Sequence, residues 1–195
     1  MTLQPTKKHN FDLIYDSQKV FRLVLYAMSN PACSVSIKEY ADKLYGDSPD
    51  FMALAMTLLD YEVSFNTCND HMLSEEITLL THAERENIEN ADFIFVRDLN
   101  DLRNVIETVK CGNLADPHKS ATVIIRNGGK SVYWLTFSGP GINGRIMISA
   151  SQTVKDSVEL RDAQNYEYPQ GVDLLFISHA GEILAIPRLT QMEVH

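Results

Sequence analysis

The chain contains one literal match to the glycine-rich G-x-G-x-x-G sequence of dinucleotide-binding proteins, GPGING at residues 139–144. In that motif a helix begins at the glycines, and its N-terminus holds the pyrophosphate. Here the glycines are followed by RIMI at residues 145–148, which is a strand pattern, and Pro140 removes one amide donor. We therefore interpret the segment as a glycine-rich turn between two strands. A weaker alternative stays open, in which Arg145 and the loop amides form a nest for an anion.

Residues 68–71 (CNDH) place a thiol, a carboxylate and an imidazole close together. A structural metal site needs four convergent ligands, and no second Cys/His pair follows at ligand spacing, so we expect no metal. Cys33, Cys68 and Cys111 lie too far apart in the sequence for the closely spaced thiolates of an iron–sulfur cluster. Their odd number and wide spacing favour reduced, buried thiols in a cytoplasmic protein.

Composition narrows the class of protein. The chain has 195 residues, a formal net charge of -9 and 45% hydrophobic residues. This length predicts a single domain over residues 1–195, with residues 1–11 as a flexible tail. The negative charge argues against nucleic-acid binding, which needs a basic surface. No run of 18 apolar residues predicts a membrane span, and the polar start predicts no secretory signal, so we expect a cytoplasmic location.

Hydrophobic periodicity and turn residues predict the elements that would position these groups. Helices are predicted over residues 16–30, 48–59, 74–83, 100–112 and 151–163, the last as a polar surface helix. Strands are predicted over 35–37, 63–65, 93–96, 122–125, 132–137, 146–148, 172–178 and 183–186.

Two hairpins are predicted among these strands. Strands 122–125 and 132–137 should pair antiparallel across NGGK at 127–130. The last two strands should form a buried hairpin that ends, or lies at a sheet edge, at Pro187. The predicted fold is α/β, a single domain with a mixed β-sheet flanked by helices.

The C-terminal residues also carry a family resemblance. YPQGVDLLF at 168–176 and GEILAIPRLTQMEV at 181–194 resemble the C-terminal sequence of the PhnH family, a subunit of the bacterial carbon–phosphorus lyase complex. Weaker similarities run in the family's order through FR at 21–22, AMSNP at 27–31, ALAMTLLD at 53–60, residues 112–122 and GPGI at 139–142. Ala32 stands where the family usually has glycine.

The resemblance implies a non-radical accessory subunit of the carbon–phosphorus lyase core complex. That complex degrades alkylphosphonates by way of a ribose phosphonate triphosphate and then cleaves the C–P bond. The partners would be the other core subunits, with a homodimer when the chain is isolated, formed through the first helix (Val20, Phe21, Val24, Met28) or the terminal hairpin. The fold would resemble a reduced pyridoxal-phosphate-dependent transferase without its cofactor site. We accordingly expect no cofactor, and no active site of the chain's own.

Three arginines are candidate contacts for a partner or an anion: Arg22, Arg145 and Arg188. Arg188 follows Pro187 at the predicted rim of the sheet, where its planar fork suits a carboxylate or phosphate. The alternative that we favour is a pair with one of the chain's own carboxylates, and Arg22 raises the same two alternatives. A different class of function also stays open, a freestanding small ligand-binding protein or enzyme with an anion site near Gly139–Arg145.

Overall fold

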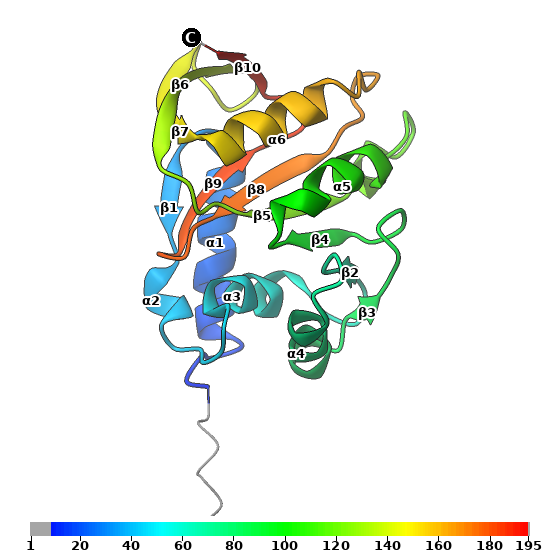
Figure 1. Ribbon diagram of the computed structural model, residues 1–195. Coiled ribbons are helices and arrows are strands. Elements are labelled where there is room, and N and C mark those ends of the chain that lie inside the picture. Colours follow the sequence, from blue (N-terminus) through cyan, green and yellow to red (C-terminus); the bar gives the residue numbers. More distant parts are fainter. Residues whose placement is uncertain (1–8, 195) are drawn as a thin grey trace, which may run out of the picture.

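A seven-stranded mixed sheet runs through the computed structural model, which describes residues 9–194, and a three-stranded antiparallel sheet lies at one end (Figure 1). The helices are α1 (Tyr15–Ser29), α2 (Lys38–Ala41), α3 (Pro49–Leu58), α4 (His71–Thr81), α5 (Leu102–Thr108) and α6 (Gln152–Asp162), with 3₁₀ turns η1 (Leu99–Asp101) and η2 (Pro117–Lys119). The strands are β1 (Ser34–Ser36), β2 (Ser64–Asn66), β3 (Glu84–Arg85), β4 (Phe93–Val96), β5 (Thr122–Arg126), β6 (Ser131–Ser138), β7 (Ile146–Ser151), β8 (Asp173–Ile177), β9 (Glu182–Ile186) and β10 (Gln191–Val194).

The large sheet has the order β1-β9-β8-β5-β4-β2-β3, and the small one the order β10-β6-β7. The five strands from β8 to β3 are parallel, while β9 and β1 are antiparallel to their neighbours. Figure 1 shows α5 and α6 in front of this sheet and α1 behind it. The predicted α/β class with a mixed sheet flanked by helices is confirmed.

Each face of the large sheet has its own hydrophobic core. Alternate residues of one strand enter different cores: Ile124 packs with α1, α3 and α4, whereas Val123 and Ile125 pack with α5 and α6. A strand covered on both faces reads as a continuous apolar run. This explains why β4, β5 and β8 lack the alternation of a half-exposed strand.

The predicted pairing of strands 122–125 and 132–137 is wrong. β5 pairs in parallel with β4 and β8, whereas β6 pairs with β7 and β10 in the small sheet. Burial gives the physical reason. Val123, Ile124 and Ile125 are fully buried and need cover on both faces, while β6 exposes Val132 and Trp134 in its first half and buries Leu135, Thr136 and Phe137 in its second. The residues between the strands therefore carry the chain from one sheet to the other.

The terminal hairpin is confirmed. β8 and β9 pair antiparallel, every residue of β8 is buried, and β9 ends directly before Pro187. β9 lies between β8 and β1, so it is not an edge strand.

Two helices differ from their predictions. α4 begins at His71, not near Ser74, because the Asp70 carboxylate accepts the Leu73 N–H at 3.1 Å and caps the helix earlier. α6 is not simply a polar surface helix, because Val154, Val158 and Arg161 form a buried face against the sheet.

The chain enters the fold through residues 9–11, the end of the expected tail over 1–11. Residues 1–8 of that expected tail lie outside the described residues. Asn10 donates its backbone N–H to Lys43 O at 2.9 Å, and Phe11 is buried in the core beside α1. None of the helices among residues 9–194 is both long enough and apolar enough to cross a membrane.

Candidate functional site

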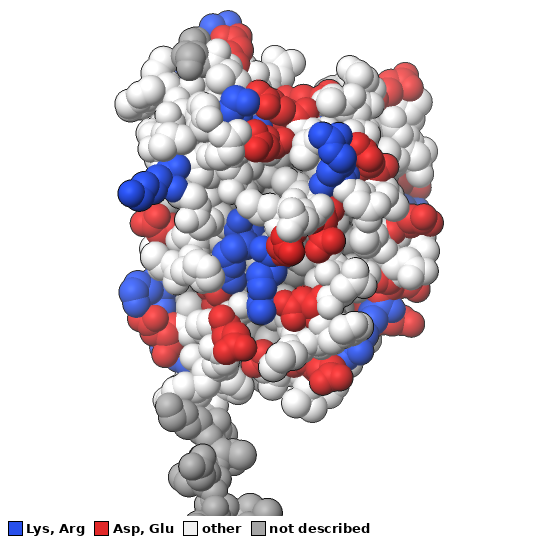
Figure 2. Space-filling model, in the orientation of Figure 1, with Lys and Arg blue, Asp and Glu red and all other residues white. Residues whose placement is uncertain are grey.

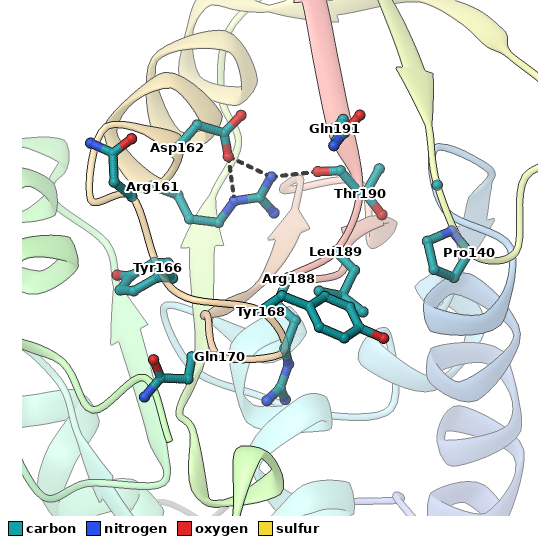
Figure 3. A pocket seen from close by; sticks show the side chains of 12 residues that line it. Pro140, Arg161, Asp162, Tyr166, Tyr168, Gln170, Arg188, Leu189, Thr190 and Gln191 are labelled. Carbon is teal, nitrogen blue, oxygen red and sulfur yellow. Dashed lines mark hydrogen bonds and ion pairs between the residues drawn. The ribbon is translucent and has the colours of Figure 1, made fainter. Parts of the chain in front are cut away.

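A cavity of about 600 Å³ opens where α6 ends, between the loop over 165–170 and the segment 188–191 (Figure 3). Gly139 and Pro140, from the loop between β6 and β7, line its other side. A second cavity of about 310 Å³ lies beside the C-terminal end of α1. The two share Pro140, Arg188, Leu189 and Thr190, so the chain after β9 forms a wall between them. We call them the large and the small terminal cavity.

The glycines of the loop explain how that wall is built. A Cβ at Gly139 would lie 2.8 Å from Leu189 O, and one at Gly141 would lie 2.5 Å from Ser29 O. Both glycines have a positive φ, 136° and 84°, which a residue with a side chain adopts only with backbone strain. The loop joins the antiparallel strands β6 and β7, so the predicted glycine-rich turn is confirmed. Its glycines permit close packing against α1 and Leu189.

Arg161 holds the segment after β9 in place. It is 2% exposed, and its NH1 donates to Ile186 O (3.2 Å) and Pro187 O (3.0 Å). NH2 donates to Thr190 O at 2.7 Å, and Nε donates to Asp162 at 2.9 Å (Figure 3). Sequence reasoning missed this residue. The signal was its spacing from Val154 and Val158, which places all three on one face of a helix.

Arg188 forms an intrachain pair. Its backbone N–H donates to Asp173 Oδ1 at 2.8 Å, its Nε donates to the same oxygen at 3.2 Å, and NH2 pairs with Oδ2. NH1 donates to Pro117 O, which ties this arginine to η2. Gly171 has a φ of 145°, and its Cβ would lie 2.9 Å from Arg188 Cβ. Of the two alternatives for Arg188, the structure therefore shows the pair with a carboxylate of the chain.

The other two predicted arginines lie apart from the terminal cavities. Arg145 NH1 pairs with Glu193 Oε2 at 3.0 Å, across the exposed surface between the start of β7 and β10. Arg22 is exposed on α1, without a hydrogen bond or ion pair to another described residue. The structure thus places Arg188 and the glycine loop in the walls of the same cavities but does not bring Arg22 or Arg145 there.

Both arginines of the large terminal cavity are engaged within the chain, and its other polar lining residues include Asn165, Gln170 and Gln191. Thr190 is 2% exposed, and its Oγ1 has no hydrogen-bond partner among the described residues. The Tyr168 ring is 77% exposed at the rim. Burial raises the pKa of Tyr166 to about 12, so its hydroxyl stays protonated and donates to Ile106 O at 3.4 Å. Since the two guanidinium groups are already engaged within the chain, this cavity suits a neutral side chain better than an anion.

The outward side of α1 is a second unusual surface. Val20 and Val24, expected to offer contact surface, are buried in the core, whereas large apolar side chains next to them are about half exposed or more. These form the α1 outer face: Leu13, Ile14, Tyr15, Phe21, Leu25 and Tyr26. The small terminal cavity lies at the C-terminal end of the same helix, beside Met28 and Ser29.

The three cysteines and the CNDH segment (68–71) do not lie in the surroundings typical of a metal site. Burial, with Asp101 nearby, raises the pKa of Cys68 to about 12, so this thiol stays neutral. Asp70 caps α4 and pairs with Arg97. Cys33 and Cys111 are only partly buried, which differs from the expectation for all three. Over residues 9–194 no group of three or more His, Cys, Asp or Glu side chains could hold a metal ion.

Two comparisons with known proteins cover nearly the whole chain. The family model described as "Bacterial phosphonate metabolism protein (PhnH)" matches residues 9–193. A protein of Stutzerimonas stutzeri, named "Putative C-P lyase subunit protein HtxG", is 26% identical over 180 residues. That similarity covers 91% of this chain and 86% of the relative.

Proposed function

Because the chain belongs to the PhnH family of bacterial phosphonate metabolism proteins, we propose that it is a non-radical, structural subunit of a carbon–phosphorus lyase complex. The observation that carries the proposal is the family match over residues 9–193, together with a relative whose name assigns it to a C-P lyase. In this role the chain takes part in alkylphosphonate catabolism. Other subunits carry out formation of the ribose phosphonate triphosphate and cleavage of the C–P bond.

The geometry of the terminal cavities supports a role in assembly. Part of their walls comes from the residues that resemble the family most closely, 168–176 and 181–194, and their arginines are engaged within the chain. A cavity with engaged arginines and an exposed tyrosine at its rim is compatible with a protein interface, where aromatic side chains are enriched. A side chain of a neighbouring subunit is therefore the occupant that we propose.

We further propose that the isolated chain forms a homodimer through the α1 outer face. The six side chains of this face together expose on the order of 700 Å², and a standard interface buries about 800 Å² per partner. A second copy would cover this face in the isolated protein, and another subunit would replace that copy in the complex. Arg22, which lies on the same helix, is a proposed contact at this interface.

The finer expectations from the family resemblance stay part of the proposal. We propose a fold related to pyridoxal-phosphate-dependent transferases that binds no such cofactor. A Schiff-base lysine needs an apolar setting that lowers its pKa, but many lysines here are in ion pairs: Lys38, Lys43, Lys110, Lys119 and Lys155. The absorption spectrum of pyridoxal phosphate should therefore stay unchanged on titration with the protein. A cytoplasmic location, compatible with the free cysteines, completes the proposal.

Co-expression tests the proposal directly. The tagged chain, expressed with the other core subunits from the same organism, should retain them through affinity purification and gel filtration. Leu25→Glu should weaken this association, because it places a charge in the α1 outer face. Leu79→Glu is the matched control, since Leu79 is also highly exposed but lies on α4.

Three results would overturn parts of the proposal. If the chain never co-purifies with the other subunits, the assigned role is wrong. If light scattering finds only monomer at micromolar concentration, the homodimer is wrong. If Leu25→Glu and Leu79→Glu behave alike, the α1 outer face is not the interface.

A further inference from the structure

A third cavity, of about 420 Å³, is lined by α4 and by the loop before α3. Gly46 and Asp47 come from that loop, and the α4 residues include a row spaced three or four residues apart. Met72 and Leu79, at the two ends of this row, are each 74% exposed. We call the cavity and its lining residues the α4 groove. Single exposed apolar residues are common, but two on one cavity mark a surface that another segment can cover.

Between its two apolar ends the α4 groove is acidic. Glu75 and Glu76 lie on the same face of α4 as those ends, and Asp47 lines the groove with them. None of these three carboxylates has a hydrogen bond or an ion pair within residues 9–194, whereas Arg97, the basic lining residue, pairs with Asp70. Figure 2 shows acidic side chains on the lower part of this face, where Figure 1 places α4 and the loop before α3. The groove therefore offers negative charge without a partner.

Glu76 is the carboxylate for which this lack of a partner matters most. It is half-buried, and its carboxylate lies so close to Gly46 that a Cβ there would be 3.1 Å from Oε1. Burial raises the pKa of Glu76 and Asp47 raises it further, against the opposing effects of His9 and, less strongly, Arg97. A positive group placed in the groove would therefore stabilise the ionised form of Glu76.

The described part of the chain begins beside this groove. His9 Nδ1 accepts the Tyr45 N–H at 3.2 Å, and the two rings stack with their centres 6.1 Å apart. Tyr45 directly precedes Gly46 of the groove lining, and His9 is close enough to lower the pKa of Glu76. The eight residues before His9 are thus tethered next to the groove. A short tether gives a segment an effective concentration in the millimolar range, which favours it over a free partner.

The sequence of residues 1–8, MTLQPTKK, has the chemistry that the α4 groove needs. Lys7 and Lys8 bring two positive charges to the place where the chain reaches the carboxylates. Leu3 supplies an apolar side chain farther along the segment. The six residues from Leu3 to Lys8 reach about 20 Å at full extension. The two apolar ends of the groove, seven residues apart on α4, are separated by only about 10 Å along the helix axis, so the segment is long enough.

We propose that residues 1–8 bind in the α4 groove of their own chain, with Lys7 and Lys8 at its carboxylates and Leu3 against its apolar side chains. The segment then covers apolar surface of α4 that would otherwise stay in contact with water. It leaves the α1 outer face and the terminal cavities open to other subunits. The α4 groove thereby has an occupant within the chain, and the proposed function holds or fails independently of it.

Oxidation of Met72 by hydrogen peroxide, followed by mass spectrometry of the isolated full-length chain, tests this proposal. The comparison is with the tail variant, Lys7→Glu combined with Lys8→Glu. Because the bound segment covers the groove, Met72 should react about threefold or more slowly in the wild type than in the tail variant. Met147, which is 56% exposed on β7, is the internal reference and should react equally in both. The protection of Met72 should fall at about 1 M salt, where the screening length is about 3 Å.

Two further variants sharpen the test. Lys19→Glu combined with Lys130→Glu is the matched control, because it changes the net charge equally but lies on α1 and between β5 and β6. It should leave the protection of Met72 unchanged. Asp47→Lys and Glu75→Lys, both at exposed positions, should restore the protection when they are added to the tail variant, because the charges are then exchanged. Circular dichroism melts confirm that each variant is folded.

Four results would overturn the proposal. Equal oxidation of Met72 in the wild type and the tail variant would show that residues 1–8 do not cover the groove. Protection that grows with protein concentration would assign the groove to a second copy. Loss of protection in the matched control would show that net charge, and not residues 7–8, is responsible. A folded charge-exchange variant without protection would show that the lysines do not pair with these carboxylates.

Discussion

Asp173 Oδ1 accepts two hydrogen bonds from Arg188, one from the backbone N–H at 2.8 Å and one from Nε at 3.2 Å. Asp173 is the first residue of β8, and Arg188 follows the end of β9, so this pair closes the open end of the terminal hairpin. Both residues belong to the segments that resemble the family most closely.

Replacing Arg188 with alanine should destabilise the fold. The substitution leaves the Asp173 carboxylate buried with part of its partners removed, and we expect a loss of about 2–3 kcal/mol in the free energy of unfolding. Urea denaturation measures the change, with Arg145→Ala as a control that should cost about 0.5 kcal/mol or less because its pair is exposed. Unchanged stability together with weaker complex formation would instead show that Arg188 contacts a partner.

Replacing Gly141 with alanine should lower the stability of the fold more than replacing Gly144 with alanine. Both have positive φ, 84° and 78°, so both variants carry a similar backbone strain of about 1 kcal/mol. Only the Cβ at Gly141 collides with another part of the chain, Ser29 O, while nothing lies within 4 Å of one at Gly144. Equal melting temperatures for the two variants would show that the loop does not need to pack closely against α1.

Arg126, at the end of β5, and Asp50, in α3, form a buried ion pair that should show strong coupling in a double-mutant cycle. Arg126→Met and Asp50→Leu should each cost about 3–5 kcal/mol, since each leaves one charge buried without its partner. The double variant should lose far less free energy of unfolding than the two single variants lose together. Arg103→Met and Glu107→Leu, in an exposed pair, form the comparison cycle, with an expected coupling of about 0.5 kcal/mol. Additive losses at Arg126 and Asp50 would contradict the pairing.

Cys68 should resist alkylation while the protein is folded. Burial and the nearby Asp101 raise its pKa to about 12, so its reactive thiolate is nearly absent at pH 8, where an ordinary thiol with a pKa of about 8.5 is partly ionised. Iodoacetamide at pH 8, followed by mass spectrometry, should label Cys33 and Cys111 first, because both are partly exposed. Labelling of Cys68 should require denaturant, and rapid labelling in the native protein would show that the 67–70 loop opens.

The sequence predicts those parts of the fold whose signals are local. The β8–β9 hairpin is recognisable because two apolar runs flank a polar turn, and the start of α3 is recognisable from Ser48 and Pro49. The partners of β5 were not predictable from the turn that follows it, because NGGK indicates where the chain turns but not which strand lies alongside. Only burial on both faces separates a central parallel strand from a hairpin strand.

The sequence likewise predicted some residues of the candidate sites and not others. Arg188 was identified from its position after Pro187, whereas Arg161 was overlooked because α6 appears polar along most of its length. Arg97 and Arg126 each directly follow a buried run, residues 94–96 for one and 123–125 for the other. Had β4 and β5 been predicted as parallel neighbours, this repeated order would have placed both arginines at one edge of the sheet.

β10, the last strand, pairs with β6, and β9 pairs with β1 near the start of the chain. Neither sheet can therefore be completed until the residues of β9 and β10 have emerged from the ribosome. During synthesis β6 can pair with β7 before β10 is available, and its other edge is then unpaired. An unpaired strand edge can pair with other chains. A chain that ends before residue 182 lacks β9 and β10, so β8 and β6 each keep an unpaired edge. Premature termination should therefore give aggregation and not a shortened native protein.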